Sequence, residues 1–300
     1  MTTFTDHAPD TDMTTTERLP NFFIIGAARS ATSSLYFYLR EHPEIFMCPD
    51  KEAQFFGFFD THRAHKSKYA SLDEYSRLFE DAGDAKIIGE ATPTYLALPE
   101  SAASIHKYCP DARLLASLRN PVDRAFSYYE MSRSKGHEKA GSFEDWMKGN
   151  RFWMEGGGYA DHLQRYIDLF GKDTLKVVLF EDIQERLEDT IAEIHEFLGV
   201  TRRRPETRPM AYNQGGSPRG LAGAMVYRLT TMRSVNRLLR PLIPSSVVGA
   251  VHRMRNKAVS PGQMKPETRK RLVGHFHDDI LRTQDLINRD LGHWLAAEKQ

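Results

Sequence analysis

The sequence predicts an α/β fold in which a central parallel β-sheet is flanked by helices. Over the first 200 residues, short apolar runs alternate with segments of helical pattern. Strands that alternate with helices pair in parallel, and helices then cover both faces of the sheet. With 300 residues, the chain also has ample apolar material for a sizeable core.

The first strand and helix are predicted in the stretch FFIIGAARSATSSLYFYLREHP, residues 22–43. Its opening apolar run ends at Gly26 and is typical of a buried strand. Leu35, Tyr36, Phe37 and Leu39 then give a helical pattern that stops before Pro43. A loop of small residues with a single arginine separates the two elements.

The same unit recurs three times. KIIGEATPTYL (86–96) predicts a strand and a proline-bearing loop, and ARLLASLRNPVDRAFSYYEMS (112–132) predicts a strand, a turn and a helix with Pro121 near its first position. TLKVVLFEDI (174–183) predicts another buried strand, and TIAEIHEFLGV (190–200) predicts a helix that closes on Gly199.

The two ends of the chain differ from this α/β part. Residues 1–20 are polar and threonine-rich, which predicts a disordered tail without a signal peptide. Residues 21–300 are expected to form one domain, with an α/β core over 21–205 and a mostly helical part over 206–300. Residues 267–295 predict a closing helix whose apolar face packs on the core. The members of that face are Leu272, Phe276, Ile280, Leu281, Ile287 and Leu291.

Charge and cysteine content exclude some classes of protein. The 41 basic and 40 acidic residues give a net charge of +1, so bulk charge predicts no nucleic-acid partner. Cys48 and Cys109 have no ligand spacing, which predicts buried thiols and a cytoplasmic location. No apolar stretch approaches the 18 residues of a membrane span.

Residues 207–266 are an exception to that charge balance, with ten basic and no acidic side chains. One interpretation is the solvated basic face of an ordinary core helix. The other is a flap over the active site that makes peripheral contact with an anionic membrane surface and meets a lipid-like acceptor.

The loop after the first strand predicts an anion site. A helix N-terminus presents backbone N–H groups and the positive end of its dipole, which favour phosphate. Arg29 adds a positively charged guanidinium, and Thr32, Ser33 and Ser34 add hydroxyl donors. The alternative is an ordinary strand-to-helix turn capped by serine or threonine.

This loop is close to the Walker A pattern but does not match it. Counted from Gly26, the sixth residue is Ala31 and the seventh is Thr32, so the lysine that meets a γ-phosphate is missing. A second anion site is predicted from Arg119, at the end of a strand, and Ser127 on the following helix.

Taken together, six segments resemble the sulfotransferases that use 3′-phosphoadenosine 5′-phosphosulfate (PAPS). They are residues 22–43, PDKEAQFF (49–56), GEATPTYL (89–96), LRNPVDRAFSYY (118–129), VVLFEDI and FLGV. The resemblance covers residues 21–220 and is closest to the bacterial and Golgi carbohydrate-type branch. It implies a P-loop-like, three-layer fold and transfer of a sulfuryl group to a hydroxyl of a small-molecule, carbohydrate or lipid-like acceptor, without a metal.

The resemblance also implies roles for individual residues. Residues 29–34 would surround the 5′-phosphosulfate, while Arg119 and Ser127 would hold the 3′-phosphate. Glu52 falls where many carbohydrate sulfotransferases have their general base. The loop members are Arg29, Ser30, Ala31, Thr32, Ser33 and Ser34.

Three positions depart from the family pattern. Ala31 replaces a glycine, which is tolerable only if its φ is not positive. Arg29 replaces a lysine and keeps the charge. Ala91 replaces the lysine of GEKTP, so a catalytic cation is missing unless Lys51 supplies it.

Glu52 has competitors for the role of base. Beside aromatic residues its carboxylate would be partly desolvated and so raised toward a neutral pKa, whereas the alternative is a salt bridge with Lys51 or a loop arginine. His137 is the rival base, and Glu90 is expected to orient a neighbour at a strand end. Trp146, Trp153 and Trp294 are expected in the core or in walls of the acceptor pocket.

Two other functions compete with the sulfotransferase hypothesis. One is an ATP-dependent small-molecule kinase, which the loop without lysine disfavours. The other is a non-catalytic nucleotide-binding module, which would have no use for Glu52 between aromatic residues.

Overall fold

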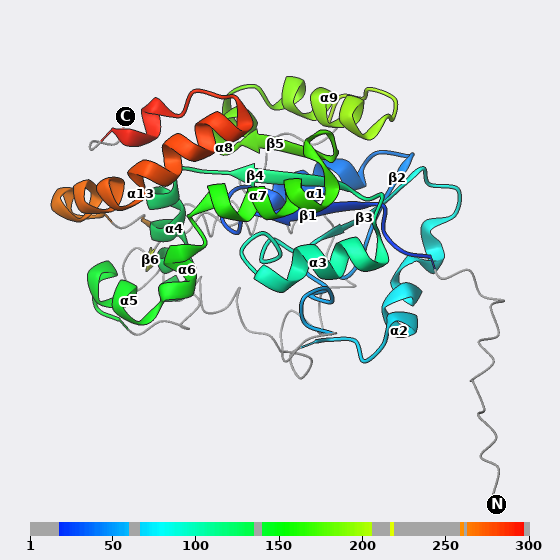
Figure 1. Cartoon of the computed structure of the whole chain (residues 1–300), viewed down its shortest axis with the longest axis horizontal. Helices are drawn as coiled ribbons and strands as arrows, with labels where there is room; N and C mark the ends of the chain where they lie inside the picture. Colours follow the sequence, from blue (N-terminus) through cyan, green and yellow to red (C-terminus); the bar gives the residue numbers. More distant parts are fainter. Residues whose placement is uncertain are drawn as a thin grey trace, which may run out of the picture.

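The computed structural model describes residues 18–59, 67–134, 140–205, 217–218, 259–260 and 263–296. Its centre is a parallel five-stranded sheet with the strand order β2-β3-β1-β4-β5 (Figure 1). The strands are β1 (Phe22–Gly26), β2 (Ile45–Met47), β3 (Ile87–Ala91), β4 (Arg113–Leu118) and β5 (Leu175–Leu179).

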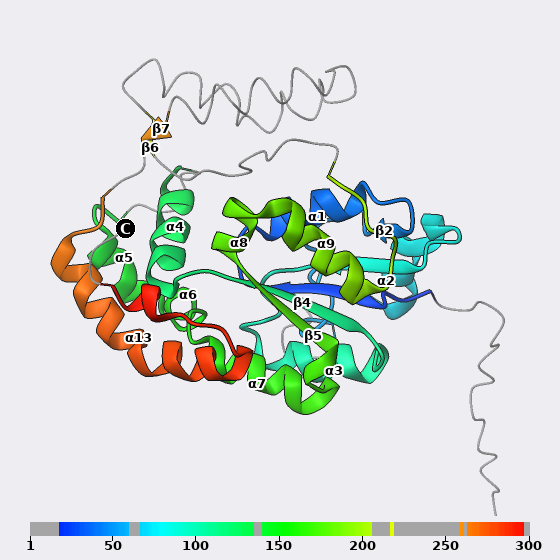
Figure 2. The same ribbon diagram turned by 90° about the horizontal axis from the view of Figure 1, so that it is seen from above.

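Helices cover both faces of this sheet, which confirms the predicted three-layer α/β fold (Figure 2). One face carries α1 (Thr32–Arg40), α8 (Phe180–Glu185) and α9 (Leu187–Leu198). The other carries α3 (Pro99–Tyr108), α4 (Pro121–Ser134), α7 (Tyr159–Phe170) and α13 (Pro266–Ile287). Shorter helices are α2 (Leu72–Ser76), α5 (Phe143–Gly149) and α6 (Arg151–Glu155).

The central strand β1 shows why the sheet is buried on both sides. Successive side chains of a strand point to opposite faces. Phe23 and Ile25 accordingly belong to the core under α3 and α7, whereas Phe22 and Ile24 belong to the core under α1 and α9. All four are fully buried, so both faces of β1 are covered by protein.

The strand order brings two predicted site segments together. β1 lies between β3 and β4, so the loop after β1 and Arg119 after β4 leave the sheet at neighbouring carboxyl ends. Ligands of open parallel sheets bind at such a point, where the strand order reverses.

Some boundaries differ from the sequence prediction. β2 was not foreseen because it has only three residues. The segment after β5 is the helix α8 and not more strand, since the Asp182 carboxylate accepts from the Leu179 amide, 3.0 Å away, and caps the helix. The predicted buried strand β5 is an edge strand, in which Val178 and Leu179 are buried and the first three residues are half-buried.

The closing helix packs on the core as expected, but it ends early. α13 stops at Ile287 because Asn288 adopts a left-handed conformation with φ 52°, and a 3₁₀ turn, Gly292–Leu295, follows. Leu272, Phe276, Ile280 and Leu291 are buried, whereas Leu281 is 37 % exposed and does not belong to the packed face.

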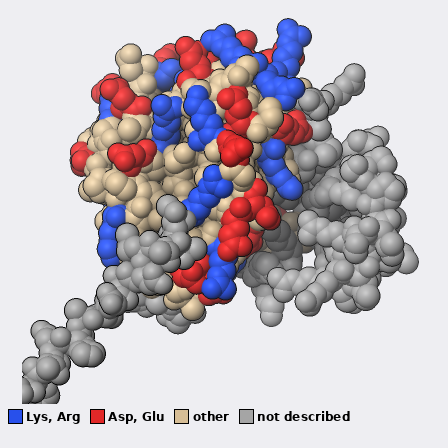
Figure 3. Space-filling model, turned by 90° about the vertical axis from the view of Figure 1, so that its right-hand side faces the viewer, with Lys and Arg blue, Asp and Glu red and all other residues tan. Residues whose placement is uncertain are grey.

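Both cysteines are free, buried thiols, as predicted. Burial raises the pKa of Cys109 to about 12. Within the described ranges, no helix combines the length and apolarity needed to cross a bilayer. Basic and acidic side chains are interspersed on the face shown in Figure 3. Apart from the short strands β6 (Ser217–Pro218) and β7 (Val259–Ser260) and residues 263–266, the basic segment 207–266 lies outside the described residues.

Candidate active site

The loop between β1 and α1 is tied to the neighbouring strand β4. The Ala27 amide donates to the Ser117 carbonyl oxygen at 2.7 Å, and the Ser117 hydroxyl donates to the Ser30 carbonyl oxygen. These bonds fix the loop at the sheet edge, directly before the N-terminus of α1. The first amides of a helix have no intrahelical acceptor, so those of Thr32 and Ser33 are available to an anion.

Ala31 contradicts the expectation that it avoids a positive φ. Its φ is 65° and its ψ is 15°, and it occupies the N-cap position of α1 without a capping side chain. Arg29 also has a positive φ, of 75°. Such left-handed conformations cost non-glycine residues about 1–2 kcal/mol each. The packing of the loop against β4 therefore maintains two strained residues beside the predicted phosphate site.

The Arg29 side chain turns toward α4. Its Nε donates to the Ser127 hydroxyl at 3.1 Å, and its Nη1 lies 3.4 Å from the Met131 sulfur, so both of these partners are uncharged. Burial, followed by repulsion from Arg119, lowers the pKa of Arg29 to about 10. A nearby anion would counter both effects.

Arg119 lies against the same loop. Its Nη1 donates to the Arg29 carbonyl oxygen at 3.3 Å, and its guanidinium carbon lies 4.4 Å from the centre of the Phe180 ring. Burial lowers the pKa of Arg119 as well. Ser127 contacts Arg29 in this structure, so the two predicted phosphate sites form one continuous cluster.

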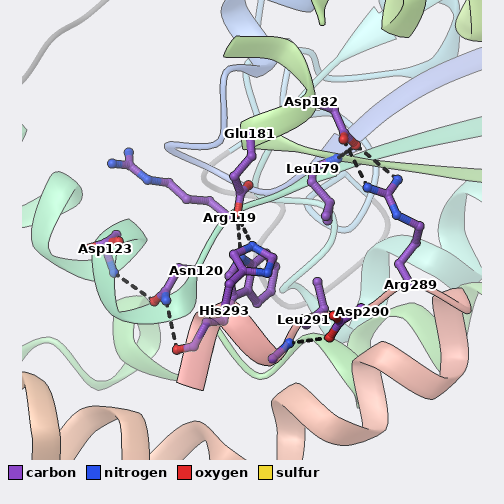
Figure 4. Close-up of polar contacts among 12 residues, drawn as sticks. Arg119, Asn120, Asp123, Leu179, Glu181, Asp182, Arg289, Asp290, Leu291 and His293 are labelled. Carbon is purple, nitrogen blue, oxygen red and sulfur yellow. Dashed lines mark hydrogen bonds and ion pairs between the residues drawn. The ribbon is translucent and has the colours of Figure 1, made fainter. Parts of the chain in front are cut away.

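The C-terminal 3₁₀ turn fixes the segment that carries Arg119 (Figure 4). The Asn120 side chain donates to the Trp294 carbonyl oxygen at 3.1 Å, while its own oxygen accepts from the Val122 amide at the start of α4. Glu181, next to Phe180, accepts from the Trp294 indole at 2.5 Å. Trp146 and Trp294 are both 1 % exposed and belong to the core.

The hydroxyl residues of the loop differ in exposure. Ser30 and Thr32 are buried, whereas Ser33 and Ser34 are half-buried at the start of α1. The Ser30 hydroxyl is also buried without a hydrogen-bond partner among the described residues. A buried hydroxyl without a partner, at the N-terminus of a helix, suits a ligand that brings its own acceptor oxygens.

Glu52 lies in a different environment from the one expected. Its side chain is 45 % exposed and its carboxylate forms an ion pair of 2.7 Å with Lys51. The neighbouring rings of Phe55 and Phe56 point into the core, so they do not desolvate it. The predicted alternative, a salt bridge with Lys51, is therefore present.

Tyr128 of α4 connects Glu52 to the arginine cluster. Its pKa is raised mainly by burial, and the charges of both Arg29 and Glu52 act on it. Lys68, which the sequence analysis did not identify, donates to the Glu52 carbonyl oxygen at 2.6 Å. Arg29 and Glu52 thus both act electrostatically on Tyr128.

A shallow depression borders the phosphate loop on the side of α6. It is lined by Ala28, Pro93, Phe152 and Arg124, among others. Arg124 is 2 % exposed, and burial lowers its pKa. The Phe152 ring is 39 % exposed.

Some predicted residues have no described environment. His137 and the Trp153 side chain lie outside the described residues. Phe180 and Tyr128 are site residues that the sequence analysis missed, although both are aromatic and lie within quoted segments of the family pattern. In the part of the chain that the structure describes, no group of His, Cys, Asp or Glu is placed to hold a metal ion.

Two half-buried arginines lie side by side where the strand order of a three-layer α/β fold reverses, an arrangement typical of proteins that bind phosphorylated ligands. The model of the sulfotransferase domain matches residues 19–211, and the chain therefore belongs to the sulfotransferase family.

Comparisons with individual proteins agree with this family. The crystal structure of a sulfotransferase from Alicyclobacillus acidocaldarius is 29 % identical, with a TM-score of 0.67, and the match covers 93 % of this chain and 99 % of that one. The membrane-associated sulfotransferase kil1 of Dictyostelium discoideum is 31 % identical over 158 residues, which is 46 % of this chain and 31 % of the relative. Human heparan sulfate glucosamine 3-O-sulfotransferase 6 is 28 % identical over 192 residues, or 62 % of this chain and 54 % of the relative. The chain thus spans about a third to half of the length of these curated relatives.

Proposed function

We propose that this protein transfers the sulfuryl group of PAPS to a hydroxyl of a carbohydrate, small-molecule or lipid-like acceptor. The observation that carries the proposal is the pair of adjacent, half-buried arginines, Arg29 and Arg119. The pKa of Arg29 is lowered both by burial and by repulsion from Arg119. Anionic groups bound between them would remove that repulsion.

The residues present fit a nucleotide with two separate phosphate groups. Arg29, the α1 amides and the Ser30 hydroxyl would bind the 5′-phosphosulfate, while Arg119 would bind the 3′-phosphate. The Ser127 hydroxyl accepts from Arg29, and its own proton would be available to either phosphate group. The Walker lysine required for a γ-phosphate is missing from the loop, which disfavours the kinase alternative.

The reaction is an in-line displacement at sulfur. The acceptor oxygen forms a bond to sulfur as the bond from sulfur to the bridging oxygen of the 5′-phosphate breaks, and the electron pair of that bond stays with the leaving adenosine 3′,5′-bisphosphate. Negative charge grows on the bridging oxygen, where Arg29 and the positive end of the α1 dipole would stabilise it. The acceptor proton passes to a base.

Glu52 is the proposed base. Its carboxylate is half exposed and paired with Lys51, so an acceptor hydroxyl could approach it directly from solvent. Lys51 would then take the place of the family lysine that is Ala91 here. The acceptor itself would approach over Pro93 and Phe152, in the depression beside the loop.

A cytoplasmic location is part of the proposal and is supported by the two free thiols. The experiment that tests the function compares nucleotides by calorimetry. Adenosine 3′,5′-bisphosphate should bind clearly more tightly than adenosine 5′-monophosphate or ATP. Tighter binding of ATP in the presence of Mg²⁺ would favour the kinase instead.

A further inference from the structure

The carboxyl end of β3 carries a buried carboxylate, Glu90, that the proposed mechanism does not use. Its side chain is fully buried. The Thr92 hydroxyl donates to its Oε1 at 2.5 Å, and the Tyr75 hydroxyl lies 3.5 Å from its Oε2. A third hydroxyl, that of Tyr95, lies near enough to help hold the pKa of this carboxylate down.

Two of these hydroxyls also hold the loop that carries Glu52. The Gln54 amide donates to the Thr92 hydroxyl oxygen at 3.2 Å. The amides of Phe55 and Phe56 donate to the Tyr95 hydroxyl oxygen at 3.0 and 3.2 Å. We name residues 52–56 the Glu52 loop. Three of its amides donate to the hydroxyls of Thr92 and Tyr95, which follow β3 in the sequence.

This loop needs such support because its backbone is strained. Glu52 and Gln54 both have a positive φ, of 65° and 56°. Non-glycine residues remain in this region only where neighbouring contacts over-determine the conformation. One further bond, from the Glu52 amide to the Ala91 carbonyl oxygen at 3.0 Å, joins the loop directly to the strand.

Proton counting shows what Glu90 contributes. A hydroxyl has a single proton and uses its oxygen lone pairs to accept. The oxygens of Thr92 and Tyr95 already accept from loop amides, so their protons must point elsewhere. An ionised carboxylate accepts only, and it can receive all three hydroxyl protons at once.

We propose that Glu90 is a positioning residue whose ionised carboxylate orients the Thr92 and Tyr95 hydroxyls, so that their oxygens hold the Glu52 loop in its strained conformation. The inference rests on the proposed role of Glu52 only for its consequence in turnover. A protonated Glu90, or a glutamine at this position, carries a hydrogen-bond donor of its own. That donor competes with the loop amides for the hydroxyl oxygens, so part of the Glu52 loop loses its hydrogen bonds.

The charge state of Glu90 makes this device dependent on pH. Burial raises the pKa of Glu90 to about 7, against the opposing effect of its three hydroxyl partners. The loop should therefore be held best above pH 7 and loosen as the pH falls below it. The titratable groups that face Glu90 are Asp50, Cys48, Tyr75, Tyr95, Cys109 and Tyr166.

The test measures hydrogen exchange in the peptide of residues 52–58, and it does not need an acceptor or any turnover. At pH 8, Glu90→Gln should raise the exchange rate of this peptide by tenfold or more. Thr92→Val, which keeps the shape but removes the hydroxyl, should act in the same direction, whereas Thr92→Ser keeps the hydroxyl and should match the unmodified protein. After correction for intrinsic rates, the unmodified protein at pH 6 should approach Glu90→Gln.

Unchanged exchange of this peptide in both Glu90→Gln and Thr92→Val would overturn the inference. An equal rise in peptides from β1 and β4 would overturn it too, because Glu90 would then support the whole fold and not this loop. Glu52→Gln separates the two proposals. It should leave the exchange unchanged, and if it also leaves turnover unchanged, the base assignment fails while the positioning result stands.

Discussion

Replacing Arg119 by alanine tests the proposed binding of the 3′-phosphate. The Arg119 side chain is already half-buried in the folded protein, so part of its desolvation does not have to occur again when the nucleotide binds. A charge-assisted hydrogen bond contributes about 1.5–3 kcal/mol. Arg119→Ala should therefore lower the affinity for adenosine 3′,5′-bisphosphate by about 10- to 150-fold.

The structure also fixes what should happen to adenosine 5′-monophosphate, which lacks the 3′-phosphate. Arg29, with a pKa of about 10, stays charged at neutral pH, so removal of Arg119 affects the 5′ site only through the loss of a neighbouring positive charge and of its bond to the Arg29 carbonyl oxygen. Calorimetry should show that the monophosphate loses much less affinity than the bisphosphate, so that the preference for the bisphosphate is largely lost. Arg77→Ala, which removes an exposed arginine paired with Asp73, is the control and should change neither affinity. An equal loss for both nucleotides would refute the assignment.

Three other predictions concern the base, the loop and the response to pH. Glu52→Gln should lower turnover by about 10²- to 10⁴-fold with little change in nucleotide affinity, and activity should survive EDTA; near-normal turnover would reject Glu52 as the base. Ala31→Gly should raise the free energy of unfolding by about 0.5–1 kcal/mol in urea titrations, because glycine adopts the observed φ of 65° without strain. A loss of stability would show that the contacts of the Ala31 methyl group outweigh this strain. Burial lowers the pKa of His195 from 6.5 to about 4, so the folded state opposes its protonation and stability should fall as the pH drops from about 6.5 to 4. His195→Asn should remove up to roughly 3 kcal/mol of that decline in urea titrations, and an identical decline in both proteins would contradict the argument.

Much of the fold could be predicted from the sequence because its local signals agree with the tertiary structure. β1 is an uninterrupted apolar run, and Gly199 ends α9 with a φ of 69°, as a C-terminal glycine does. β2 and α8 were missed because three residues are too few for a periodicity, and because the cap of α8 depends on an aspartate inside an otherwise strand-like segment.

The candidate site was predicted as a set of residues but not as a geometry. Arg29, Ser127 and Arg119 do come together, because the strand order puts β1 beside β4. The partner of Ser127 could not be read from the sequence, since it depends on the direction in which the Arg29 side chain turns. The exposure of the Glu52 side chain was not predicted, because the aromatic residues beside it in sequence point inward.

Glu90 shows a limit of reading a strand end from its sequence. The prediction that it orients a neighbour named no partner, because Tyr75 and Tyr95 reach it from other elements. Its raised pKa depends on complete burial at the carboxyl end of β3. Neither property follows from the letters GEATP alone.

Transfer of a radiolabelled sulfuryl group from PAPS is the measurement that tests the central claim most directly. The protein would be incubated with labelled PAPS and an extract of its host's small molecules, in the presence of EDTA, beside Glu52→Gln as the matched control. If the protein transfers the sulfuryl group with Glu52 as the base, a labelled product should form with the unmodified protein and be strongly reduced with the variant. Absence of any labelled product, together with Mg²⁺-dependent transfer of the γ-phosphate of ATP to a molecule of the same extract, would contradict it.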